Sequence, residues 1–223
     1  MCLRVGNLEV IRKEITKFEK SFLPANNYKS NINLLLDNVL SKVCDYIGFK
    51  LAFSDLARVF ENLYVGDNTL AVGLQNLIEP FRIVCKKIPE NKLPLVLQSI
   101  FKALVSAWMY YLLFFIPLHK AEELMALPKI IQNDQEFFDD FFIANDIENE
   151  GRGLTKEFMR EEVAVINVIV QRLKQSDKEL IEAYKNIESN KIYMKEIVVR
   201  VLYGRNSNEA NQFFKLHANI ILK

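Results

Sequence analysis

The feature that most constrains this chain is the apolar stretch FKALVSAWMYYLLFFIPL, residues 101–118, in which Lys102 is the only charged residue. A helix that spans a membrane needs about 20 predominantly apolar residues, whereas a run of about 10–14 is more often a buried core helix. The uncharged part covers residues 103–118, and a serine, a tryptophan and two tyrosines interrupt its aliphatic content. We therefore expect a buried helix that ends at Pro117.

The alternative for residues 103–118 is a membrane-associated helix. In that arrangement the stretch inserts into a bilayer, and the flanking basic residues Lys92, Lys102, His119 and Lys120 anchor it at the interface. Apart from this alternative, peripheral contact with endomembranes or the plasma membrane is also compatible with a cytoplasmic protein.

The composition indicates a cytoplasmic protein without a nucleic-acid partner. Of 223 residues, 50% are hydrophobic, which is enough for a substantial core. The net charge of +1 creates no overall field that would attract nucleic acid or an anionic membrane. Three widely spaced cysteines without a CxxC motif are typical of reduced thiols in the cytosol, and the N-terminal residues lack the apolar segment of a secretory signal.

Helical periodicity predicts an all-α protein. The sequence holds only seven glycines and six prolines, and few runs alternate as strands do. We expect an elongated stacked bundle or rod of roughly eight to ten helices. It should form a single unit over residues 1–223, with a candidate sub-boundary near 117–128. No residue signature repeats at a fixed period of about 30–45 residues.

Several helix boundaries follow from the same spacing. Residues 31–64 carry one apolar stripe, which predicts a helix of about eight turns or more. Residues 69–88 predict a helix with a kink at Pro80. Pro128 is expected to separate a short segment, 121–127, from the helix that follows it.

The later helices carry clearer start signals. The sequence Ser176-Asp-Lys-Glu179 has the form of a capping box, so a helix should start near Ser176. Asn206 or Ser207 should cap the last helix. Earlier in the chain, after Pro128, four phenylalanines lie at helical spacing and form one broad face: Phe137, Phe138, Phe141 and Phe142.

No set of residues in the sequence predicts catalysis, a metal site or a cofactor. The carboxylates Asp134, Glu136, Asp139 and Asp140 have no matching histidine, so we interpret them as a solvated helix face. The loop with Gly151 and Gly153 lacks the GK[ST] ending of a phosphate-binding loop. Glu161 and Glu162 are adjacent and cannot face one another on a helix, so an enzyme is not expected.

Three stretches taken together resemble one family. They are residues 42–67, 137–163 and 198–217, and they occur in the same order as in the C-terminal part of MUN-domain (mammalian-uncoordinated homology) proteins of vesicle priming. The resemblance is strongest to the plant-type branch that is implicated in delivering proton pumps to the plasma membrane. The residues that carry it are Phe53, Asp55, Leu56, Phe60, Leu63, Tyr64, Phe141, Phe142, Gly151, Gly153, Leu154, Arg200, Val201, Leu202, Arg205, Glu209, Ala210 and Phe213.

The resemblance implies a non-catalytic helical rod related to the subunits of tethering complexes. Such a rod holds membrane-fusion or tethering proteins during vesicle tethering, priming or exocytic delivery. Members of the family are much longer, so the chain looks like a fragment or a shortened paralogue. The glycine-rich loop is also longer and more acidic here than in the family.

The candidate interaction residues come from two sources. The resemblance points to the helix end at Phe53, Asp55, Phe60 and Tyr64 and to the loop at Gly151, Gly153 and Leu154. The apolar stretch contributes Tyr110 and Tyr111, in a cluster with Phe114 and Phe115. Each group also has an interpretation as core or turn, and packing is favoured for Phe60, Leu63, Phe141 and Phe142.

A local excess of basic residues in 190–223 is explained better by solvated helix faces than by a lipid-binding patch.

Overall fold

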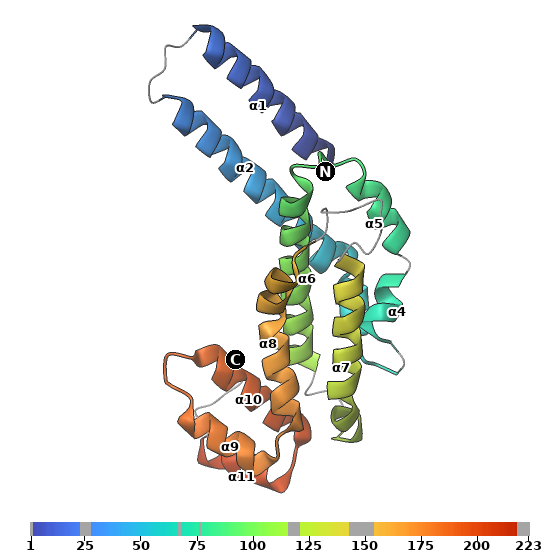
Figure 1. Ribbon diagram of the computed structural model, residues 1–223. Helices are drawn as coiled ribbons and strands as arrows, with labels where there is room; N and C mark the ends of the chain where they lie inside the picture. Colours follow the sequence, from blue (N-terminus) through green and yellow to red (C-terminus); the bar gives the residue numbers. More distant parts are fainter. Residues whose placement is uncertain are drawn as a thin grey trace.

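The protein is a rod of stacked helices, as expected. A computed structural model describes residues 2–22, 28–66, 68–75, 77–115, 121–142 and 154–217, and within them the chain forms eleven α-helices, one short π-helix and no strand. The helix count exceeds the expected upper value by one, because two of the predicted helices are each divided and two others form one continuous helix. Figure 1 shows an elongated molecule with a helical hairpin at one end, a central layer, and a small group of C-terminal helices at the other end.

The hairpin consists of α1 (Cys2–Phe22) and α2 (Tyr28–Lys50). An ion pair between Arg12 and Asp37 joins the two helices. Lys92 pairs with Glu9 at 3.1 Å and ties α1 to the start of the central helix. The outer part of the hairpin projects beyond the central layer (Figure 1).

The centre of the rod is α6 (Leu93–Phe115), which contains the described part of the apolar stretch. It packs against α2 and α8 (Lys156–Lys174). Phe101, Ala107 and Trp108 are fully buried, so the expected core helix is confirmed. Among the described residues α6 is the one helix long and apolar enough to cross a membrane, and 56% of that window is already buried within the protein.

The predicted helix over 31–64 is interrupted by a π-helix, η1 (Leu51–Asp55), before the short α3 (Ala57–Glu61). The Leu56 N–H donates to the Leu51 carbonyl over 2.9 Å, which is the wider spacing of a π-turn. Residues spaced by four drift about 40° per step around a straight α-helix. The wider turn compensates this drift, so Ala52, Leu56 and Phe60 all stay buried.

The predicted helix over 69–88 is divided as well. Helix α4 (Leu70–Gln75) ends before Pro80, and α5 (Ile78–Cys85) has Pro80 as its third residue. In the first turn of a helix the missing N–H of proline removes no intrahelical hydrogen bond. The break before Pro80 therefore replaces the expected kink at it.

Pro128 does not separate two segments, in contrast to the prediction. It lies inside one continuous helix, α7 (Ala121–Phe142). An interior proline costs roughly 3 kcal/mol or more in an isolated helix. Here Leu127, Ile131 and Phe138 are buried on both sides of the proline, and this packing holds the helix together. The sub-boundary near 117–128 stays a prediction, because residues 116–120 lie outside the described part of the chain.

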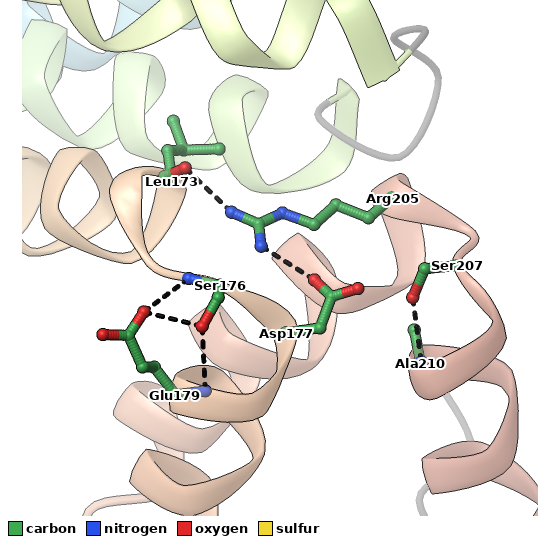
Figure 2. Close-up of polar contacts among 7 residues, drawn as sticks. All are labelled: Leu173, Ser176, Asp177, Glu179, Arg205, Ser207 and Ala210. Carbon is green, nitrogen blue, oxygen red and sulfur yellow. Dashed lines mark hydrogen bonds and ion pairs between the residues drawn. The ribbon is translucent and has the colours of Figure 1, made fainter.

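The C-terminal group contains α9 (Asp177–Asn186), α10 (Ile192–Arg205) and α11 (Asn208–Leu216). The predicted capping box is confirmed, since the Glu179 carboxylate accepts a 2.7 Å bond from the Ser176 N–H and the Ser176 hydroxyl accepts from the Glu179 N–H. Ser207 caps α11 by accepting from the Ala210 N–H at 3.0 Å (Figure 2).

Arg205 joins α8, α9 and α10. Its guanidinium pairs with Asp177 at 2.7 Å and donates to the Leu173 carbonyl over 2.8 Å, so it connects the end of α10 to the junction of α8 and α9 (Figure 2). The Leu173 carbonyl belongs to the last turn of α8, where no intrahelical donor is available.

The crossing of α2 and α6 depends on Gly48. A Cβ atom at this position would lie 2.5 Å from the Ser99 carbonyl oxygen and 3.1 Å from the Ala103 Cβ. We expect Gly48→Ala to lower the free energy of unfolding by about 1–3 kcal/mol, because the two helices must separate. Urea unfolding followed by far-UV circular dichroism measures this change.

Gly6→Ala is the matched control, because Gly6 is also helical and nothing lies within 4 Å of its added Cβ. Alanine should stabilise this position by about 0.5–1 kcal/mol. Equal effects of the two substitutions would contradict the close crossing.

Candidate interaction surface

Exposed aromatic side chains gather on one side of the central layer. Tyr46 and Phe49 of α2 are 55% and 58% exposed, and Tyr110 and Phe114 of α6 are 44% and 45% exposed. Phe53 of η1 lies between these pairs and is half-buried. We call these five residues the aromatic surface.

Helical spacing places these rings in a row. Tyr46, Phe49 and Phe53 recur at i, i+3 and i+7, and Tyr110 and Phe114 recur at i and i+4, so each set lies on one helix face. Phe49 stacks on Phe53 with centroids 5.0 Å apart, Phe53 meets the edge of Tyr110 at 6.4 Å, and Tyr110 lies 4.3 Å from Phe114. The row therefore crosses from α2 to α6 without a break.

One end of the row is fixed by Arg200 of α10. The guanidinium carbon of Arg200 lies 4.4 Å from the centroid of the Phe114 ring, a cation–π contact. Arg200 also donates to Glu196 over 2.7 Å. This arginine is one of the residues that carried the family resemblance.

The other end continues along α2 as an apolar stripe. Leu35 and Val39 are exposed, and with Lys42, Tyr46, Phe49 and Phe53 they follow steps of four and three residues. This spacing is the one that presents a continuous seam to a partner helix. Apart from Lys42, the side chains of this stripe are apolar, and exposed apolar patches mark interaction sites.

Beneath the surface lies a second aromatic pair. Tyr111 stacks on Phe60 with centroids 5.5 Å apart and the ring planes almost parallel, and it also meets the edge of Tyr110 at 5.3 Å. Phe60 is fully buried, so its packing interpretation is supported. The pair supports the exposed Tyr110 ring from below.

A buried hydrogen-bond network fixes the far side of α6. Trp108 Nε1 donates to the Tyr64 hydroxyl over 3.0 Å, and the Tyr64 hydroxyl bonds with the Asp134 carboxylate of α7. Asp134 also accepts from the N–H groups of Leu70 and Ala71 at 2.9 and 3.1 Å. A side chain from α7 thus caps the N-terminus of α4.

Burial dominates the protonation behaviour of this network. It raises the pKa of the Asp134 carboxyl, although the bonds from Leu70, Ala71 and Tyr64 act in the opposite direction. Burial also raises the pKa of Tyr64 well above its usual value, and the nearby Asp134 charge adds to the effect. Tyr64 has a positive φ of 62°, a conformation that non-glycine residues rarely adopt.

The interpretation of Asp134 as part of a solvated helix face is therefore wrong. Its side chain is buried because the N-terminus of α4 and the Tyr64 hydroxyl supply donors inside the core. Glu136 and Asp140 are exposed and Asp139 is half-exposed, as expected for that face.

The structure brings several of the candidate interaction residues together. Phe53 and Tyr110 belong to the aromatic surface, with Phe60 and Tyr111 directly beneath it. Tyr64 belongs to the buried network instead. Their role in binding stays a prediction.

The other candidates lie apart from this surface. Asp55 is exposed and pairs with Lys50 at 2.7 Å, and Leu154 is buried. Gly151 and Gly153 lie outside the described residues, as does the side chain of Phe115.

Sequence reasoning missed Tyr46, Phe49 and the Asp134 network. The i, i+3, i+7 spacing of the α2 aromatics was a usable signal for the first two. No local signal pointed to the network. In the described part of the chain, no group of three or more His, Cys, Asp or Glu side chains could hold a metal ion.

Comparison with known proteins supports the plant-type branch of the expected family, although neither description names a MUN domain. Residues 1–221 match the family described as "PATROL1-like, TPR repeats". The chain belongs to the PATROL1-like family. No solved structure matches this chain. The family is described by TPR repeats, whereas no residue signature recurs at a fixed period in this sequence. Adjacent helices nevertheless pack in pairs, α1 with α2, α7 with α8 and α9 with α10, as helical repeats do.

One relative is the "Protein unc-13 homolog" of Arabidopsis thaliana. It is 28% identical over 226 residues, which cover 92% of this chain and 19% of the relative. The chain thus spans about a fifth of the length of this relative.

Removal of the Tyr64 hydroxyl should destabilise the fold. In Tyr64→Phe the Trp108 N–H loses its acceptor inside the core, and Asp134 loses a donor. We expect the free energy of unfolding to fall by about 1–3 kcal/mol. Urea unfolding monitored by circular dichroism measures the loss, and Tyr203→Phe, at an exposed tyrosine, is the control. Similar small effects for both variants would show that the network contributes little.

The raised pKa of Asp134 predicts a pH dependence of stability. The pKa of Asp134 is higher in the folded state than in the unfolded state, so protonation of Asp134 stabilises the fold. This stabilisation is fully present below the unfolded pKa of about 3.9 and is lost as the pH rises through the folded pKa. Asp134→Asn has no such titration. The stability advantage of the natural protein over this variant should therefore be largest at acidic pH and shrink toward neutral pH. Unfolding of both proteins across this pH range tests the sign, and an advantage that grows with pH would contradict it.

Proposed function

We propose that this chain is a non-catalytic helical interaction module of the MUN type that acts in vesicle tethering, priming or exocytic delivery of membrane proteins. The observation that carries the proposal is the aromatic surface, an exposed row of rings on a rigid helical layer in a PATROL1-like protein. The name of the Arabidopsis thaliana relative, an unc-13 homolog, supports the same process.

The aromatic surface has the properties of a protein-binding site. Tyrosines and other aromatic residues are enriched at the centres of interfaces, where they bury large areas with few rotatable bonds. The surface is supported from below by the Phe60–Tyr111 stack and held at one end by Arg200. It is therefore ordered before a partner arrives, which lowers the entropic cost of binding.

The partner should present an amphipathic helix. The stripe from Leu35 to Phe53 has the spacing into which the apolar face of another helix packs. Membrane-fusion proteins and other tethering proteins are the partners we propose, through the resemblance to MUN-domain proteins and the subunits of tethering complexes. The protein would then work in the cytoplasm, peripherally at endomembranes or the plasma membrane.

Neither catalysis nor membrane insertion is part of the proposal. Glu162, in the one acidic pair considered for catalysis, forms an ion pair with Lys102 at 3.3 Å and so links α8 to α6. Phe101, Leu104 and Trp108 of the apolar helix lie in the protein core. A membrane-inserted α6 would have to give up these contacts.

Charge placed on the aromatic surface should weaken binding. Tyr110→Glu and Phe49→Glu each put a carboxylate into the row, and we expect each to weaken capture of a fusion or tethering protein by about tenfold or more, the loss typical of an interface hot spot. Pulldown and surface plasmon resonance with purified full chain measure this. Tyr193→Glu, at an exposed tyrosine of α10 that is not among the five residues of the aromatic surface, is the matched control.

Two outcomes would count against the proposal. If the purified chain bound no fusion or tethering protein and its deletion left secretion unchanged, the function would be wrong. If Tyr110→Glu and Phe49→Glu bound as well as Tyr193→Glu while circular dichroism showed an intact fold, the aromatic surface would not be the interface.

A further inference from the structure

A separate apolar pocket opens on another side of α2. It has a volume of about 420 Å³ and is lined by side chains of α2, η1, α4, α5, α6 and α7. Pockets that bind small ligands have volumes of roughly 300–1,000 Å³. Ile47, Lys50 and Leu51 line this pocket, whereas Tyr46, Phe49 and Phe53 of the aromatic surface lie on a different side of the same helix turns.

The interior of the pocket suits a hydrocarbon chain. Its inner wall includes the buried side chains Leu74, Ile100 and Leu104. Phe81 closes one side and packs against Phe141, with centroids 5.2 Å apart. Apart from Lys50 and Asp55, the lining side chains are all apolar, so no convergent polar groups are available for a sugar or a nucleotide.

The polar side chains of the lining lie together at the solvent-exposed edge. Lys50 Nζ contacts both carboxylate oxygens of Asp55, at 2.7 and 2.9 Å, and both residues are more than 40% exposed. A lysine ammonium has three N–H donors, so this pair leaves one donor for a ligand. An apolar interior with a single donor at its edge is suited to an amphiphile.

The charges around the opening favour an anionic head group. Cys85 and Ile88 line the pocket, and the exposed Lys86 and Lys87 lie between them in the chain. Arg82 is exposed one turn earlier on α5. With Lys50, these cations outnumber the acidic side chains described at or near the lining residues, Asp55, Glu90 and Asp140, by four to three.

We propose that this pocket binds the hydrocarbon chain of a single-chain fatty acid, with the carboxylate beside Lys50. The chain fills the apolar interior, and each methylene removed from water favours binding. The carboxylate accepts from Lys50 and lies in the positive field of Arg82, Lys86 and Lys87. This site is independent of the interaction surface of the proposed function.

Calorimetric titration of the full chain with dodecanoate below its micelle concentration tests the site. The natural protein should bind one molecule saturably. Cys85→Phe fills the pocket from its half-buried wall and should weaken binding by about tenfold or more through steric overlap. Ile83→Phe, an exposed position on the same helix, should bind as the natural protein does.

The position of the carboxylate beside Lys50 is tested by removing the charge of this lysine. Lys50→Gln should weaken dodecanoate binding by about two- to fivefold, the size of an exposed ion pair, and should leave dodecanol binding unchanged. Lys42→Gln, at an exposed lysine of α2 outside the lining, is the control.

A labelling experiment covers the case in which Cys85→Phe fails to fold. In a Cys2→Ser chain, dodecanoate should slow the reaction of Cys85 with a maleimide, while the buried Cys44 contributes little. The proposal is overturned if dodecanoate neither binds saturably nor protects Cys85. It is also overturned if Cys85→Phe, correctly folded, binds normally, or if only phospholipid vesicles or a captured protein partner protect Cys85.

The two proposals can be contradicted independently of one another. Tyr110→Glu should bind dodecanoate normally, and Cys85→Phe should still capture a protein partner. Loss of both activities in one folded variant would show that the pocket and the aromatic surface are not independent.

Discussion

The close approach of α2 and α6 at Gly48 is the constraint on which the rest of the structure depends. The Ser99 hydroxyl donates to Asp45 over 3.0 Å one turn before that glycine, so the crossing is fixed by a polar contact as well as by backbone contact. Because the two helices touch here and run in the same direction (Figure 1), Phe53, just after the end of α2, is brought to Tyr110 near the end of α6. The same crossing places α2 beside the pocket and the hairpin outside the central layer. Both proposed sites therefore depend on how α2 and α6 pack.

Asp134 illustrates how an irregular segment is held in an otherwise regular rod. The chain between α3 and α4 turns sharply at Tyr64, and the first N–H groups of α4 have no partners within their own helix. A carboxylate from α7 satisfies two of them, and the tyrosine and Trp108 complete the network. Burial of a charge is costly, and its three hydrogen bonds offset only part of that cost, so the pKa of Asp134 stays raised. The network connects α4, α6 and α7, so the short helices are positioned by the core.

The sequence predicts features that depend on nearby residues, and it fails where distant residues decide. The capping box at Ser176 was visible because both partners lie within four positions. Burial of the apolar helix was predicted from the length and the composition of its uncharged run. By contrast, Asp134 bonds with a backbone group 64 positions away, and no local pattern encodes that partner. The π-turn at Leu51 and the continuous helix through Pro128 likewise depend on tertiary packing. For the interaction surface, Phe53 and Tyr110 were predicted. The spacing of Tyr46 and Phe49 places them on the same helix face as Phe53, and the structure adds that this face is exposed.

The long span between Asp45 and Ser99 bears on the order in which the chain assembles. These residues are 54 positions apart, so the central crossing closes a large loop and must overcome its closure entropy before any contact of α6 with α2 contributes. The bond between Arg205 and Asp177 spans 28 positions, and the C-terminal helices also pack with their immediate neighbours. Contacts that are local in sequence form faster than distant ones. We expect the C-terminal helices to gain protection from hydrogen exchange first during refolding, as a platform on which the slower central crossing then closes.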